Sequence, residues 1–216
     1  MSDAPPPSPK RNAPLALWRV AHGFVTTLLN LFGEPGEIAG TYIKAGPRKL
    51  MLAWLCAGEA LMRRLLLIEA AAYPKPNFPP PAPRAEAPRA PRKKVLCEAT
   101  APEAWPVHFR AITRPSEPAL APNGTKRPPQ RLFDAWPLAI RLEAMLRVLN
   151  DPEDYAKRLS RRLHKKPRRT RALLREPAAR ERQSGDIPHA PDLVGRESWK
   201  LVTQAAREAR MAFNTS

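Results

Sequence analysis

The chain has 216 residues and a formal net charge of +17, from 37 lysines and arginines against 20 aspartates and glutamates. It contains 28 prolines, and 15 of them fall between Pro74 and Pro129. Proline lacks a backbone donor and disfavours helix at the preceding residue, which excludes a long helix or a central strand from that stretch. Only 6% of the residues are aromatic, so smaller helical modules fit better than one large core.

Two helices are predicted before the proline-rich stretch. We expect residues 1–13 to be a disordered tail, and Pro14 suits the first turn of a helix over residues 15–32. Gly33 and the following Pro35-Gly36 pair end that helix. Its apolar residues share one broad face. They are Trp18, Ala21, Val25, Leu28, Leu29 and Phe32.

The second predicted helix runs from Pro47 to about Ala72 and ends at Tyr73-Pro74. Ala57 and Gly58 lie on its apolar face, where small residues would let another helix approach closely. We place an i,i+4 pair of Glu59 and Arg63 on the opposite side. Residues 14–73 then form an amphipathic helical hairpin. Cys56 is expected to be a small buried hydrophobe.

Two helices cannot cover all of this apolar surface between them. The surface could pack against the C-terminal helices, form an oligomer, or lie on a membrane through Trp18, Phe24 and Trp54. A membrane-spanning helix is not expected over residues 50–72, because that stretch contains four charged residues. Cys56 and Cys97 have no paired spacing, which favours a reducing, cytoplasmic location, with a membrane-peripheral one as the alternative.

Residues 74–130 are predicted to be a disordered, proline-rich linker with one ordered island at residues 105–112. An imperfect repeat begins in that island. Residues 103–110 align with residues 134–141, and four of the eight positions are identical. Trp105 and Trp136 could be duplicated docking anchors for a partner. The alternative explanation of the repeat is that it arose by chance, or that the two segments are similar helix starts without a docking role.

The C-terminal third contains the densest charge. Residues 131–183 are predicted to hold a helix capped by Asp134, and then a second helix with Asp151 as its cap and Pro152 in its first turn. The apolar stripes are Leu138, Leu142, Met145 and Leu149 on the first helix, and Tyr155, Leu159 and Leu163 on the second. Residues 184–195 are expected to be a loop, and residues 196–216 a last helix with Trp199, Val202, Ala206, Ala209 and Phe213 along one stripe.

Residues 157–182 include 12 basic and two acidic side chains. A focused positive field of this kind attracts polyanions, and arginine can bind phosphate with two donors at once. The predicted polyanion-binding residues are Lys157, Arg158, Arg161, Arg162, Lys165, Lys166, Arg168, Arg169 and Arg171. A solvated helix face, or arginine enrichment from a GC-rich genome, would give the same composition.

No catalytic or metal-binding motif is recognised. His22, His108, His164 and His189 stand apart in the sequence, and a phosphate-binding glycine loop is missing. We therefore predict a mainly α-helical, non-enzymatic protein without a cofactor. Its predicted partner is a polyanion, with nucleic acid ahead of an anionic membrane surface. A homo-oligomer or a protein partner through the N-terminal helices is the remaining alternative.

Overall fold

The computed structural model describes residues 13–75, 101–109, 111, 132–165 and 196–215. The prediction of a mainly helical chain is confirmed for this part of the sequence. The tail before residue 13, most of the expected linker and residues 166–195 lie outside the described residues. The elements are α1 (Leu15–Phe32), α2 (Pro35–Ala39), β1 (Tyr42–Ile43), α3 (Ala45–Ala72), η1 (Pro102–Ala104), β2 (Phe133–Asp134), α4 (Trp136–Asn150), α5 (Pro152–Lys165) and α9 (Arg196–Thr215).

The end of α1 is fixed by a glycine, as the sequence predicts. Gly33 has a φ of +90°, a conformation that favours glycine, and its amide donates to the Leu29 carbonyl at 2.8 Å. A short helix that was not predicted, α2, follows at once. Glu34 and Glu37 form a reciprocal capping box at its start. α2 then lies against α4.

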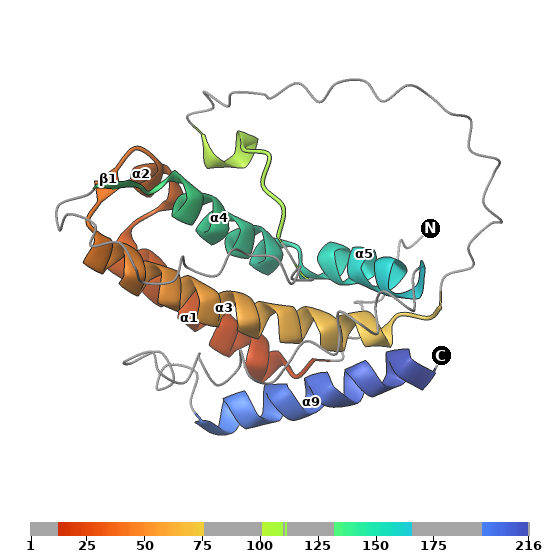
Figure 1. Ribbon diagram of the computed structural model, residues 1–216. Helices are drawn as coiled ribbons and strands as arrows, with labels where there is room; N and C mark the ends of the chain where they lie inside the picture. Colours follow the sequence, from red (N-terminus) through yellow and green to blue (C-terminus); the bar gives the residue numbers. More distant parts are fainter. Residues whose placement is uncertain (1–12, 76–100, 110, 112–131, 166–195, 216) are drawn as a thin grey trace, which may run out of the picture.

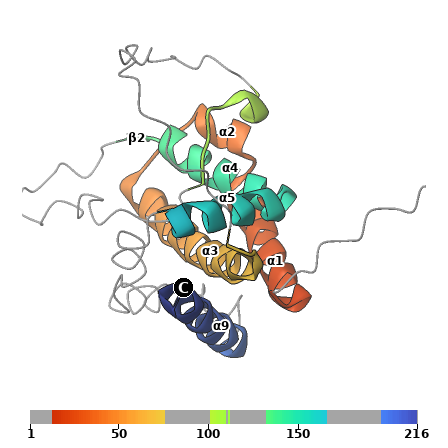
Figure 2. The ribbon, with the colours of Figure 1, turned by 90° about the vertical axis from the view of Figure 1, so that its right-hand side faces the viewer.

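The 28-residue helix α3 is the centre of the structure. It packs against α1, α4, α5 and α9. Figure 2 shows α4 and α5 on one side of α3 and α9 on the opposite side. One hydrophobic core includes buried residues from all five helices. The apolar surface of α3 is therefore covered by α1 together with the protein's own C-terminal helices, and the two expected modules meet in a shared core.

Most of the predicted apolar stripes are buried, with local differences. On α1, Leu17 and Phe24 are buried, whereas Leu29 and Phe32 are only half-buried. The predicted start of α3 at Pro47 was two residues late. On α4, Val148 is buried where Leu149 was expected. Val202, Ala206, Ala209 and Phe213 of α9 are buried as predicted.

The small residue at position 58 permits the close contact predicted from the sequence. Gly58 of α3 is buried between α1 and α4. A Cβ atom placed there would lie 2.7 Å from Cε1 of Phe24 and 3.0 Å from Sδ of Met145. Such distances are too short for unstrained contacts, so a larger side chain would force Phe24 and Met145 to shift.

A two-residue antiparallel ladder links the N-terminal and C-terminal parts of the chain. Tyr42 pairs with Asp134 and Ile43 with Phe133. The Ala135 amide donates to the Thr41 carbonyl at 3.1 Å, which extends the link. The predicted cap by Asp134 was wrong, because Ala135 is the residue at the N-cap of α4 and no side chain caps the helix there. Oδ1 of Asp134 instead accepts from the Trp136 amide, two residues later, at 2.9 Å. The ladder was not predicted, since two-residue strands leave no periodic pattern.

Part of the expected linker folds back onto α4. Arg147 holds it there, because its Nη2 donates to the carbonyls of Pro102 at 2.7 Å and Glu103 at 3.1 Å. Trp105 and Val107 are buried in the shared core. The ordered island expected at residues 105–112 therefore begins earlier, at residue 101, and residues 110 and 112 lie outside the described residues.

Two glycine substitutions test the close approach at α3. Gly58→Ala should lower the free energy of unfolding by about 1–3 kcal/mol, because the added methyl group meets Phe24 and Met145. Gly23→Ala in α1 is the matched control, since no atom lies within 4 Å of the added Cβ. It should raise the free energy of unfolding by roughly 0.5–1 kcal/mol. Urea denaturation followed by circular dichroism measures both. Equal effects would show that Gly58 is not a contact point.

Candidate polyanion-binding face

The helix that carries the densest described charge, α5, begins as the sequence predicts. The Asp154 amide donates to Oδ1 of Asp151 at 3.2 Å, and Pro152 occupies the first turn. Glu153 and Asp154 lie near the positive end of the helix dipole, and basic residues fill the last turn. Both placements stabilise the helix electrostatically.

The inward side of α5 is apolar. Ala156, Leu159 and Leu163 are buried, together with the hydroxyl-bearing Ser160. The predicted anchor Tyr155 is only half-buried. These residues face the core because α5 packs against α3 and α4. The orientation of the helix is therefore set by its apolar residues, which leave the charged ones outside.

The outward side of α5 holds five exposed basic residues, which together form the basic face: Lys157, Arg158, Arg161, Arg162 and Lys165. At a rise of about 1.5 Å per residue, the first and the last are separated by roughly 12 Å along the helix. The other predicted ligands are Lys166, Arg168, Arg169 and Arg171, and they lie outside the described residues.

One member of the basic face is already engaged within the helix. Nη2 of Arg158 donates to Oδ2 of Asp154, and its guanidinium group lies 5.6 Å from the centre of the Tyr155 ring. The hydrogen bond and the charge of Asp154 raise the pKa of Arg158. Lys157, Arg161, Arg162 and Lys165 are therefore the stronger candidates for contact with an external anion.

The two tryptophans of the repeat contact each other. Their ring centres are 4.6 Å apart with an angle of 54° between the planes. Trp105 is buried and Trp136 is half-buried. Trp136 begins α4, whereas Trp105 follows the short helix η1 in extended backbone. Both rings therefore pack within the protein itself, and the two copies of the repeat adopt different local structures.

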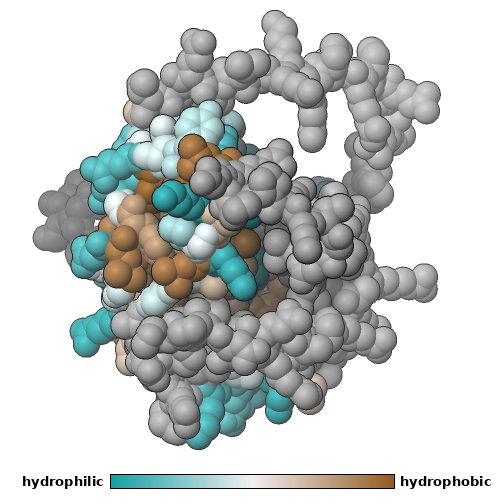
Figure 3. Space-filling model, turned by 60° about the vertical axis from the view of Figure 1, so that its left-hand side comes forward, coloured by the Kyte–Doolittle hydropathy of each residue, from teal (hydrophilic) through white to brown (hydrophobic). Residues whose placement is uncertain are grey.

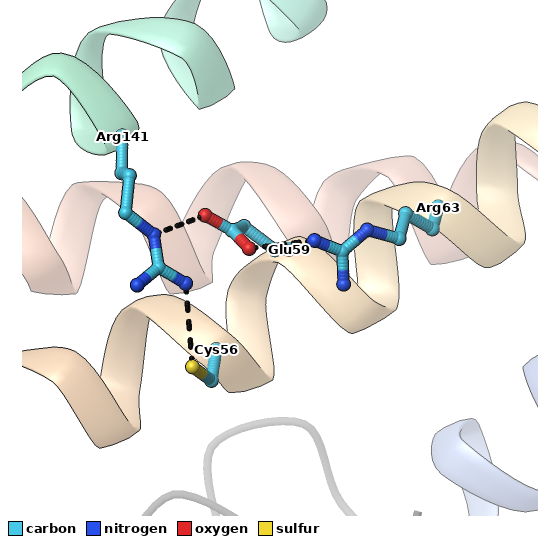
Figure 4. A network of polar contacts seen from close by, with 4 residues as sticks. All are labelled: Cys56, Glu59, Arg63 and Arg141. Carbon is cyan, nitrogen blue, oxygen red and sulfur yellow. Dashed lines mark hydrogen bonds and ion pairs between the residues drawn. The ribbon is translucent and has the colours of Figure 1, made fainter. Parts of the chain in front are cut away.

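A polar network that was not predicted joins α3 to α4 (Figure 4). Glu59 accepts from Nη2 of Arg63 at 2.7 Å and from Nε of Arg141 at 2.6 Å. The expected Glu59–Arg63 pair is confirmed, but its expected place on the outer side was wrong. Glu59 is buried because α4 covers this side of α3.

Arg141 also reaches a cysteine in the same network. Its Nη2 lies 3.3 Å from Sγ of Cys56, and Cys56 is exposed. The prediction of a buried Cys56 was wrong, because its neighbours Leu55 and Ala57 take the inward positions. Burial alone would lower the pKa of Arg141, but the hydrogen bond and charge of Glu59 raise it.

Within the described part of the chain, no group of three or more His, Cys, Asp or Glu residues could hold a metal ion. His22 and His108 are exposed and His164 is half-buried, whereas His189 lies outside the described residues. Among the described helices, α1 is long and apolar enough by composition to cross a membrane, and a third of its residues are buried in the protein. The core helix of a soluble protein and a signal sequence near the N-terminus both pass the same test.

Apolar surface gathers at the end of the molecule where β1 and α3 begin (Figure 3). Four large apolar side chains of the elements that meet there are exposed: Leu31, Tyr42, Leu50 and Leu132. In the same region, the Arg48 guanidinium group lies 4.8 Å from the centre of the Phe133 ring. α5 lies toward the opposite end of the bundle (Figure 1), so the apolar surface and the basic face are separate.

No protein-family model, no curated protein sequence and no solved structure matches this chain. The functional argument therefore depends on the chemistry of the described residues.

The network around Glu59 gives a second stability prediction. Glu59→Gln should lower the free energy of unfolding by about 1–3 kcal/mol, because it leaves the guanidinium group of Arg141 without its carboxylate. Asp154→Asn is the matched control, since it breaks an exposed pair with Arg158 and should cost under about 1 kcal/mol. Thermal or urea unfolding compares them. A smaller loss for Glu59→Gln than for Asp154→Asn contradicts a structural role of the network.

Proposed function

We propose that this protein is a non-enzymatic interaction protein that binds nucleic acid, without strong sequence preference, through the basic face of α5. The observation that carries the proposal is the exposure of all five basic side chains on a helix whose other side is fixed in the core. Because the helix is held in place, these charges are presented together and the binding site needs no large rearrangement.

The chemistry of the face suits a phosphate backbone better than base recognition. Arginine offers planar, paired donors to phosphate oxygens, and neutralised phosphates release counterions. Among the described residues of α5, Tyr155 is the one phenylalanine, tyrosine or tryptophan, and it is half-buried and lies near Arg158. Stacking on single-stranded bases requires accessible rings, so a duplex is the better candidate.

An anionic membrane surface is the second candidate partner, because it also attracts basic helices. The expected insertion through the N-terminal helices, however, has a structural cost. Trp18, Phe24 and Trp54 are buried in the core, with 5%, 2% and 6% of their surfaces exposed. Inserting these side chains into lipid would first require opening that core, which favours the nucleic-acid proposal.

The proposal predicts a salt-dependent affinity that depends on four side chains. The variant changes four residues together to Gln: Lys157, Arg161, Arg162 and Lys165. Arg158 is left unchanged because it is paired with Asp154. Binding to a duplex DNA of mixed sequence should weaken, and the slope of log K against log salt should fall by up to about 3.6, because each neutralised phosphate contributes roughly 0.9. Fluorescence anisotropy at several salt concentrations measures the slope. The helix should survive, since Gln is a good helix former.

A control variant with the same change in net charge separates the basic face from general attraction. Arg19, Lys44, Lys49 and Arg207 are exposed on or next to other helices. Changing these four to Gln should leave most of the slope in place. An equal loss of slope in both variants would show that the basic face is only a solvated surface and not the binding site. A loss seen on anionic vesicles and absent on DNA would favour the membrane alternative.

A further inference from the structure

His164 lies at the border between the core side of α5 and its basic face. It follows the buried Ser160 by four residues and the exposed Arg161 by three, so it is next to both on the helix surface. Lys157, seven residues earlier, lies in the same row. The histidine is half-buried. It is therefore close enough to the basic face to add a charge to it.

The cover over His164 comes from the last helix. The rings of His164 and Phe213 have centres 5.2 Å apart and planes at 60°. Phe213 is buried, with 8% of its surface exposed. α9 runs beside α3, and its C-terminal end lies near the C-terminal end of α5 (Figure 1). The contact thus joins the proposed binding helix to a helix more than 30 residues away in sequence.

Desolvation by burial is the main cause that lowers the pKa of His164, and the charge of Lys75, just after α3, lowers it further. On its own helix, Lys157, Arg161 and Lys165 are nearby, and Arg210 of α9 lies one turn before Phe213. Burial and the charge of Lys75 both disfavour a positive charge on the ring, so the neutral ring is favoured in the free protein.

We propose that His164, packed against Phe213 at the edge of the basic face, is a proton-dependent ligand of the polyanion that this face binds. The inference rests on the proposed function. A bound phosphate chain would bring negative charge to the basic face and favour the imidazolium form. This form could donate to a phosphate oxygen through both of its ring nitrogens.

The direction of the pH dependence follows from linkage. The pKa of His164 lies below its ordinary value in the free protein, and bound phosphates would raise it. At a pH between the two values, binding takes up a proton, so affinity increases as the pH falls. At a pH below both pKa values, the ring is charged in the free and in the bound protein, and the affinity no longer changes with pH.

The binding test uses the full chain and a 20-base-pair duplex DNA of mixed sequence at constant ionic strength. From pH 7.5 to pH 5.5, the affinity of the wild type should increase by roughly threefold to tenfold more than that of His164→Gln, since raising a pKa by one favours the protonated form about tenfold. His22→Gln is the control, because His22 is exposed on α1. It should keep the wild-type gain.

A second measurement needs no polyanion. Histidine ring signals in NMR should give His164 of the free wild type a pKa below its ordinary value. Phe213→Ala should raise that pKa, whereas Phe213→Leu, which keeps an apolar cover, should leave it low. An unchanged pKa in Phe213→Ala contradicts the role of Phe213.

The outcomes separate this inference from the proposed function. If the wild type binds DNA and His164→Gln shows the same pH gain, the proposed function stands and His164 is not a ligand. If the wild type binds no DNA between pH 5.5 and pH 7.5, the proposed function fails and the ligand role of His164 fails with it. In that case the NMR result reports on the Phe213 contact alone.

Discussion

The packing of α3 on four other helices is the constraint on which the rest of the structure depends. Every residue from Arg64 to Ala70 is buried, so this quarter of the helix is enclosed on all sides. A helix buried all round needs several neighbours, because no single partner can cover its circumference. A polar contact also lies there, since Nε1 of Trp18 donates to Oε1 of Glu69 at 2.9 Å. α1, α4, α5 and α9 are the neighbours.

The same constraint determines which side of α5 meets solvent. Leu159 and Leu163 have to be buried, and α3 offers the apolar surface that buries them. Because the helix repeat places Arg161, Arg162 and Lys165 away from those leucines, the charges point outward. The proposed binding face is therefore a consequence of core packing. Its density of arginine and lysine is the one feature that packing does not require.

Much of the fold could be predicted from the sequence. The helix ends follow from local signals, such as Gly33 after α1 and Asp151 with Pro152 before α5. The burial of Gly58 in a close contact also follows from residue size. Tertiary features were harder. The buried position of Glu59 depends on where α4 lies, and the periodicity of α3 carries no information about α4.

In the candidate site, too, some features could be predicted from the sequence and others could not. The exposure of the basic face could be predicted, because the stripe of Leu159 and Leu163 fixes the register of α5. Three other features could not. The Asp154 pair makes Arg158 a weaker candidate ligand, and Trp105 and Trp136 pack on each other. The contact between His164 and Phe213 joins residues that are far apart in sequence, and neither residue carries a local signal for it.

Native-state hydrogen exchange tests the central claim, a single core around α3, most directly. Leu65 of α3 is fully buried, and Leu65→Ala should lower the free energy of unfolding by about 2–5 kcal/mol. Mass spectrometry would follow peptides from α1, α4 and α5 in the wild type and the variant. If these helices share one core, their slowest-exchanging amides should lose protection together and by similar amounts. Loss of protection in α1, with α4 and α5 unchanged, would show that the N-terminal and C-terminal helices fold as separate modules.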